Sequence, residues 1–167
     1  MLNNIEHILA EVGKELTCDV AGGNCLNFAV AAQQAFASIG IHLQVLSVMR
    51  TVDGDDSIDG WFSHAVLYLG HKATPYFDDK LTIDHLGAGA FGRWSTLWNE
   101  FQVECGEPEE EFWLEHIEMP INEFLDFAAR KYGCEKEGKL VNDLKLRSSI
   151  VKLIQKHPLF LALKLAA

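Results

Sequence analysis

Apolar residues recur at helical spacing in the first quarter of the chain. Segment Leu2–Leu16 places them three and four positions apart, with charged residues on the other side, which predicts an amphipathic packing helix. After a loop over Thr17–Asn24, a second helical pattern runs from Cys25 to Ile39 and ends before Gly40, a residue suited to a helix C-terminus. One face of this second helix carries Cys25, Phe28, Ala29, Ala32 and Phe36. The pattern therefore turns the Cys25 side chain towards the protein interior.

The middle of the chain changes to the alternating and β-branched patterns that are typical of strands. These patterns cover Ile41–Val52, Trp61–Leu69, Ala73–Asp79, Phe101–Cys105 and Phe112–Met119. A short segment separates the second run from the third, which predicts a β-hairpin. Together the runs predict an antiparallel sheet.

The segment Leu81–Trp98 is rich in glycine and aromatic residues. It lacks the glycine spacing of a phosphate-binding loop and no helix is expected to follow it, so nucleotide binding is not predicted. The aromatic residues suit a loop folded over a cleft or a surface turn anchored in the core. We favour the surface turn, because aromatic clusters mostly serve packing.

Helical patterns return in the last third of the chain. They cover Ile121–Tyr132 after Pro120, Leu140–Lys156, and the apolar segment Pro158–Ala167. Helices, then an antiparallel sheet, then helices predict an α+β fold in which the cysteine-bearing helix packs on the sheet. A length of 167 residues suits one domain over 1–167.

Charge and composition exclude several classes of function. The chain has 14 Lys and Arg against 24 Asp and Glu, a formal net charge of -10, and no basic patch that would favour nucleic acid. No apolar run approaches the roughly 18 residues of a membrane span. The N-terminus lacks the parts of a signal peptide, and the cysteines lack the paired spacing of zinc or redox motifs. These features predict reduced thiols in a cytoplasmic protein, although an effector exported without a leader would share them.

Acidic residues concentrate in two segments, Asp53–Asp59 and Glu104–Glu111, which we interpret as solvated loops that could contact a protein partner. The first has acidic or hydroxyl side chains at alternate positions, as an EF-hand loop does. Ile58 and His64 replace the glycine and the final glutamate that calcium requires there. We therefore expect no metal and no cofactor.

Cys25 is a candidate nucleophile. A thiol in the first turn of a helix lies beside unpaired backbone amides and the positive end of the helix dipole, which lower its pKa and favour the thiolate. Gly22 and Gly23 allow a tight turn and the close approach of a substrate before it. The alternative is a small core residue, since free cysteines are commonly buried.

His64 is a candidate base. If the hairpin turn centres on His71, His64 lies directly opposite Asp78 on the neighbouring strand. An aspartate in that place fixes the tautomer of a histidine and stabilises its charged form. In a different register Asp79 or Asp84 would compete for the role, and a histidine at a strand edge can also serve the structure alone.

This set of residues resembles the papain-like cysteine peptidase superfamily in its compact bacterial and phage versions. The similarity covers Thr17–Asp84, where a cysteine begins a helix, a histidine begins a strand and an aspartate ends the next, in the unpermuted order. The resemblance implies a cysteine protease or amidase with a peptide or protein substrate. Cys25 would be the nucleophile, His64 the base and then the acid, and Asp78 the orienting residue. The thioester acyl-enzyme would pass to water or an amine, and the Cys25 backbone amide and the Asn24 side chain would hold the oxyanion.

A second hypothesis keeps the fold without catalysis. Papain-like proteases place a glutamine a few residues before the cysteine, whereas this chain has Asp19, and an ionised aspartate cannot donate to an oxyanion. Together with the acidic loops, this favours an inactive protein-binding module of the immunity or adaptor type. The hypothesis predicts that Cys25→Ala leaves function intact, whereas changes in Asp53–Asp59 weaken binding.

Overall fold

The computed structural model describes residues 1–16, 24–51, 61–70, 77–120, 123, 124, 126, 127 and 143–166. Its helices are α1 (Leu2–Glu15), α3 (Cys25–Ala37), α4 (Ala90–Glu104), α6 (Leu144–Lys156) and α7 (Pro158–Ala166), with a short 3-10 helix η1 (Asp79–Leu81). Its strands are β1 (Gln44–Arg50), β2 (Trp61–Tyr68), β3 (Thr82–Asp84), β4 (Gly87–Ala88) and β5 (Phe112–His116). The fold is α+β, as the sequence predicts. None of the helices in the described ranges is both long and apolar enough to cross a membrane.

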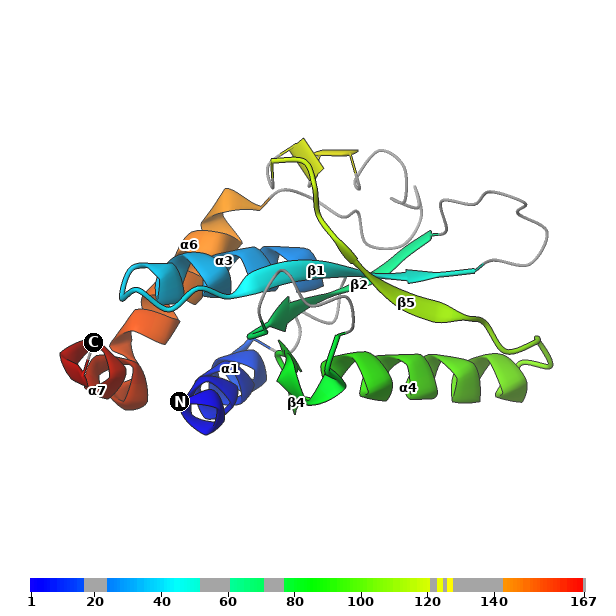
Figure 1. The fold of residues 1–167 in the computed structure, drawn as a ribbon, viewed down its shortest axis with the longest axis horizontal. Helices are drawn as coiled ribbons and strands as arrows, with labels where there is room; N and C mark the ends of the chain where they lie inside the picture. Colours follow the sequence, from blue (N-terminus) through cyan, green and yellow to red (C-terminus); the bar gives the residue numbers. More distant parts are fainter. Residues whose placement is uncertain are drawn as a thin grey trace.

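The five strands form one sheet in the order β4-β3-β2-β1-β5, and every neighbouring pair is antiparallel. Helices α1, α3 and α6 cover one face of the sheet, and α4 lies against the other (Figure 1). Alternate residues of β2 separate the two faces: Ala65 and Leu67 pack with the first group of helices, whereas Val66 and Tyr68 pack under α4. The sheet therefore holds two apolar cores apart.

Helix α3 runs through the larger core and is buried on most of its sides. Its start is fixed by Asn27, which is fully buried and donates from Nδ2 to the Asn24 side chain at 3.1 Å. The side-chain oxygen Oδ1 of Asn27 accepts from the backbone amide of Asp143, which caps α6 with its own side chain. These bonds satisfy a buried amide and hold the N-terminal end of α3 in place.

Most of the predicted elements are confirmed with small changes of length. The helices expected at Leu2–Leu16, Cys25–Ile39, Leu140–Lys156 and Pro158–Ala167 are α1, α3, α6 and α7. The strands expected at Ile41–Val52, Trp61–Leu69 and Phe112–Met119 are β1, β2 and β5. Each of these segments combines a clear periodicity with a sharp end, such as Gly40 or Pro158, and such segments are predicted best.

Two predictions in the centre of the chain are wrong. Phe101–Cys105 is not a strand, because Phe101–Glu104 forms the last turn of α4 and Cys105 is its C-cap. Leu81–Trp98 is not a surface turn, because it contains β3, β4 and the first half of α4, so a helix does follow the glycines. Helix α4 is rich in aromatic residues of low intrinsic helix propensity, and its N-cap Gly89 has no side chain to signal a start.

The expected hairpin also differs from the observed pairing. On its side away from β1, strand β2 pairs with β3, with Leu67 opposite Ile83, and Asp79 belongs to η1. Most of the run Ala73–Asp79 lies outside the described residues. So do the loop before Cys25 with Cys18, Asp19, Gly22 and Gly23, the acidic loop Asp53–Gly60, Cys134, and most of Ile121–Tyr132.

Candidate active site

A β-bulge in β2 stands next to His64. Val48 of β1 pairs with His64, but the next residue, Met49, pairs with Phe62, so Ser63 is an extra residue in the ladder. Bulges redirect the neighbouring side chain and are common beside active sites. The His64 side chain is buried, and its ring stacks on Trp94 of α4 with centroids 4.4 Å apart and planes at 14°. Trp94 in turn donates from Nε1 to the Ser63 hydroxyl at 3.0 Å.

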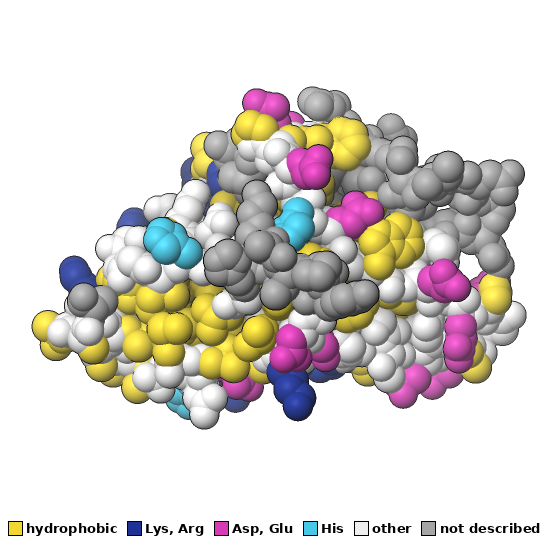
Figure 2. All heavy atoms as spheres, viewed as in Figure 1, with side chains coloured by type: hydrophobic (Ala, Val, Ile, Leu, Met, Phe, Trp, Pro, Cys, Tyr) yellow, Lys and Arg dark blue, Asp and Glu magenta, His cyan; other side chains and the backbone are white. Residues whose placement is uncertain are grey.

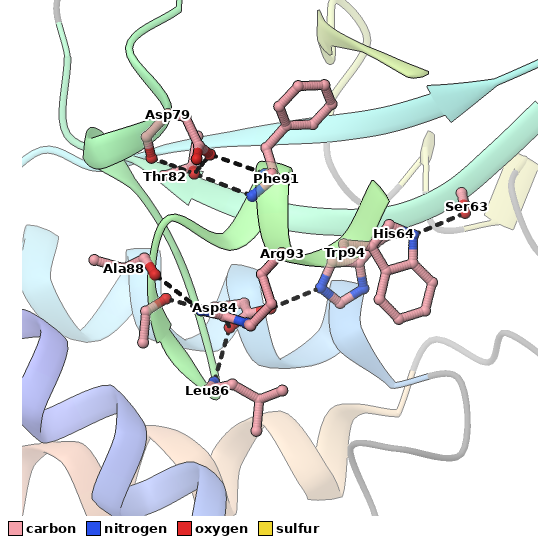
Figure 3. A network of polar contacts seen from close by, with 12 residues as sticks. Ser63, His64, Asp79, Thr82, Asp84, Leu86, Ala88, Phe91, Arg93 and Trp94 are labelled. Atoms are coloured by element: carbon pink, nitrogen blue, oxygen red, sulfur yellow. Dashed lines mark hydrogen bonds and ion pairs between the residues drawn. The ribbon is translucent and has the colours of Figure 1, made fainter. Parts of the chain in front are cut away.

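Asp84 at the end of β3 is the carboxylate that binds His64. The His64 Nε2 and Asp84 Oδ2 atoms are 3.1 Å apart, and both side chains are at most 5% exposed (Figure 3). The other oxygen, Oδ1, accepts from the Leu86 amide at 2.8 Å and from Arg93 Nη2 at 2.5 Å. Burial acts to raise the pKa of Asp84, but the hydrogen bond and charge of His64, the Leu86 amide and the Arg93 charge together lower it. Asp84 is therefore ionised.

Cys25 is the first residue of α3 and the second side chain that interacts with the imidazole. Its side chain is half-buried and forms a hydrogen bond with the His64 side chain. Because Nε2 of His64 is engaged by Asp84, Nδ1 is the nitrogen that remains for the thiol. The backbones of Leu26 and Ala65 also hydrogen-bond with the Cys25 side chain. The structure thus brings Cys25, His64 and Asp84 into one hydrogen-bonded chain.

The electrostatics of the pair favour a thiolate and an imidazolium. Burial raises the pKa of Cys25, but the charge and hydrogen bond of His64 outweigh it and the pKa is lowered from the usual value. Burial lowers the pKa of His64, but the Cys25 charge and the bond to Asp84 raise it to about 9. Both shifts move the equilibrium of the pair towards a proton on His64 and a negative charge on the sulfur.

The start of α3 provides hydrogen-bond donors beside the sulfur. Asn24 is the N-cap residue, and its side chain makes no capping bond to the backbone amides of the first turn. Its side-chain oxygen Oδ1 instead accepts from Asn27 Nδ2. The two oxyanion donors that the sequence suggests, Asn24 and the Cys25 amide, are the N-cap and the first residue of α3. Amides at a helix N-terminus stabilise negative charge.

The structure places Asp78 away from the role that the sequence assigned to it. Asp78 is exposed, and its Oδ1 accepts from the Lys80 amide at 3.0 Å as the N-cap of η1. Asp79 binds the Thr82 hydroxyl and the Gly92 amide, and so serves the start of α4. Of the three aspartates that the sequence suggested, Asp84 lies beside His64. The register that placed Asp78 opposite His64 is wrong, because β2 pairs with β3 through Leu67 and Ile83.

Sequence reasoning missed the roles of Arg93, Trp94 and His85. The His85 ring lies edge-on to His64 and to Phe28, with centroids 6.3 and 6.0 Å apart, and burial lowers its pKa. Its Nδ1 is buried without a hydrogen-bond partner among the described residues. The positions of these side chains depend on β4 and on the start of α4, which no periodicity in the sequence indicates.

A metal ion could use one atom each from His64, Asp84 and His85, which lie within 4.8 Å of one another. Both oxygens of Asp84 are already engaged, one by His64 and one by the cationic side chain of Arg93. A metal cation would have to displace the imidazole proton and tolerate the neighbouring guanidinium. The observed contacts therefore favour a protonated His64 over a metal ligand.

Comparisons of this chain with models of protein families, with curated proteins and with solved structures gave no significant match.

Proposed function

We propose that this protein is a cysteine hydrolase that cleaves an amide or peptide bond, with Cys25 as nucleophile, His64 as acid and base, and Asp84 as the orienting carboxylate. The observation that supports it is the continuous hydrogen-bonded chain from the Cys25 thiol through His64 to Asp84. The order of the three residues along the chain is that of unpermuted papain-like enzymes. A buried cysteine that served packing alone would need neither partner.

In the first half of the reaction, the Cys25 thiolate attacks the carbonyl carbon and forms a carbon–sulfur bond. The electron pair of the carbonyl moves to oxygen, where the Cys25 amide at the start of α3 stabilises it. His64 then gives the proton on Nδ1 to the leaving nitrogen as the carbon–nitrogen bond breaks. The products are a free amine and a thioester on Cys25, and His64 is neutral.

In the second half, neutral His64 takes a proton from water, and the water oxygen attacks the thioester carbon. The carbon–sulfur bond breaks and releases a carboxylic acid, which restores the thiolate and the imidazolium. An amine in place of water would give a transferred acyl group by the same steps. Asp84 remains ionised throughout and keeps the imidazole ring in one orientation.

Acyl-enzyme formation tests this proposal without knowledge of the natural substrate. The protein is mixed with p-nitrophenyl acetate at pH 7, quenched in acid, and mapped by peptide mass. We expect one acetyl group on Cys25, and roughly a hundredfold slower acetylation of that residue in His64→Ala, within the range for loss of a general base. Cys105, an exposed thiol, is the internal reference. The proposal would be contradicted if Cys25 and Cys105 were acetylated at the same rate and His64→Ala left both rates unchanged.

The second candidate function is a binding module, and the outer side of α4 favours it. Leu97, Phe101 and Val103 are each more than half exposed. A hollow of about 540 Å³ beside them is lined by Thr96, Asn99, Glu100, Val103, Glu104 and Glu109. Figure 2 shows acidic side chains gathered over this part of the molecule, at the lower right. A partner for such a surface would be basic and amphipathic.

Fluorescence anisotropy with a lysine–leucine amphipathic peptide tests this second candidate. Binding through α4 should weaken roughly tenfold or more in the double variant Glu100→Lys, Glu104→Lys, because each change replaces attraction by repulsion. Cys25→Ala should leave it unchanged. Equal binding by the charge-reversed variant, or no binding at all, would contradict a role for this surface.

A further inference from the structure

The guanidinium of Arg93 connects the Asp84 carboxylate to the backbone of β4. Nη2 donates to Asp84 Oδ1 at 2.5 Å and to the Gly87 carbonyl at 3.3 Å, and Nη1 donates to the Ala88 carbonyl at 2.8 Å (Figure 3). The Arg93 side chain is 29% exposed, so most of it is withdrawn from water. A planar fork with several donors in fixed directions can make these bonds together.

Arg93 lies in the first turn of α4, where the helix dipole disfavours a positive charge. It follows Ala90, Phe91 and Gly92 in the first turn of α4, at the positive end of the helix dipole, and no acidic residue occupies that turn. Asp84, from another element, supplies the compensating charge. A residue that breaks a local rule and is compensated at a candidate active site is expected to have a function there.

The start of α4 is itself fixed from outside the helix. Asp79 Oδ1 accepts from the Gly92 amide at 3.0 Å, and the Thr82 hydroxyl oxygen accepts from the Phe91 amide at 3.2 Å. A Cβ on Gly92 would lie only 2.8 Å from the Asp79 carboxylate, so glycine allows this close approach. The first turn of α4 therefore has one position relative to β3, and Arg93 reaches Asp84 from a rigid base.

We propose that Arg93 is a positioning residue of the candidate active site. Its fork holds the Asp84 carboxylate so that Oδ2 faces His64, and it thereby maintains the charge-separated Cys25–His64 pair. The inference rests on the proposed function. With the Leu86 amide alone on Oδ1, the carboxylate could rotate away from the imidazole, whereas the additional bonds from Arg93 to β4 oppose that rotation.

The test compares Arg93→Gln, Arg93→Lys and the control Arg50→Gln by the rate of Cys25 alkylation with iodoacetamide from pH 4 to 9. Arg50 forms an ion pair with Glu110 of the same 2.5 Å length, on another part of the sheet. Loss of the charge-assisted bond in Arg93→Gln should slow alkylation at pH 6 roughly tenfold. Alkylation of Arg93→Lys should also be slower than in the wild type, by more than half of the Arg93→Gln effect on a logarithmic scale. A lysine ammonium is a point charge and lacks the planar set of donors of the guanidinium. Arg50→Gln should change the rate less than about twofold.

The same comparison in an Asp84→Asn background tests whether Arg93 acts through Asp84. In that background Arg93→Gln should have no further effect on the rate, since the carboxylate that it positions is gone. Independent, multiplicative effects would overturn the proposal, and so would an unchanged pH profile in Arg93→Gln or full recovery by Arg93→Lys. If circular dichroism shows that Arg93→Gln does not fold, Arg93→Lys is used for the test instead. Its pH profile of Cys25 alkylation must then differ from that of the wild type. An ordinary thiol profile in the wild-type protein would instead refute the proposed function itself.

Discussion

Asp84→Asn is the substitution that separates the observed site from the one the sequence suggested, because Asp78→Asn provides a matched control. Asp84 accepts hydrogen bonds on both oxygens, from His64 on one side and from Arg93 and Leu86 on the other. An asparagine can accept on one atom only, so its NH2 group must face a donor on one of the two sides. The exposed Asp78 instead uses Oδ1 to accept from the Lys80 amide, and an asparagine can preserve that bond.

The magnitude follows from the burial of the His64–Asp84 pair, in which both side chains are at most 5% exposed. A buried hydrogen bond to a charged group is worth about 1.5 to 3 kcal/mol, which corresponds to roughly 1 to 2 pH units in the protonation of His64. Loss of the carboxylate should therefore lower the pKa of His64 from about 9 towards its usual value. Asp84 also holds the imidazolium towards Cys25, so its loss weakens the stabilisation of the thiolate, and the thiolate fraction at pH 6 should fall roughly tenfold or more.

Cys25 alkylation by iodoacetamide, followed by peptide mass across pH 4 to 9, measures this fraction. Asp84→Asn should move the profile to higher pH, and Asp78→Asn should follow the wild type within about twofold. Circular dichroism shows whether both variants fold. Equal profiles for Asp84→Asn and the wild type, or an equal displacement in Asp78→Asn, would refute the assignment of Asp84.

An NMR titration of the His64 ring protons should show a midpoint near pH 9. Cys25→Ser should lower that midpoint because it removes the thiolate, and an unchanged midpoint would argue against the ion pair. Gly13→Ala in α1 should destabilise the fold by about 1 to 3 kcal/mol, since its new Cβ would overlap the His85 carbonyl oxygen. A lower urea midpoint would show this, and an unchanged one would contradict the close packing. Asp79→Ala should cost about 1 kcal/mol by removing the acceptor at the start of α4. The measurement is the Tm, and a Tm equal to that of the wild type would exclude a capping role.

Cys25 and His64 could be identified from sequence because each lies in a strong local pattern. The apolar stripe that begins at Cys25 sets the start and the buried face of α3. The alternation from Trp61 onwards identifies β2, and its faces separate as expected beyond His64. The bulge at Ser63 has no such signal, because one extra residue in a strand leaves the composition unchanged.

Asp84 could not be selected over Asp78 by local reasoning. Strand β3 has three residues, too few to show a periodicity, and its pairing with β2 depends on the path of the chain between them. The sequence left Asp84 as one of three alternatives, and a tight hairpin favoured the wrong one. The choice required the tertiary pairing of Leu67 with Ile83.

Helix α4 was missed because its stabilisation is not local. Its first turn has neither a side-chain N-cap nor an acidic residue. The acceptors for its first amides come from Asp79 of η1 and Thr82 of β3. Its tryptophans and phenylalanines favour strands when judged by propensity alone. Arg93 and Trp94 reach the site on this helix, so any error in placing α4 also hides their contacts with Asp84 and His64.

Iodoacetamide alkylation of Cys25 against pH, in the wild type and in His64→Ala, distinguishes a thiolate activated by His64 from an ordinary thiol. We expect fast alkylation of the wild type well below pH 7, because the neighbouring imidazolium stabilises the thiolate, and loss of that reactivity in His64→Ala. A wild-type profile that follows an ordinary thiol, with a pKa of about 8.5, would contradict activation of Cys25 by His64. A profile that His64→Ala leaves unchanged would contradict it as well.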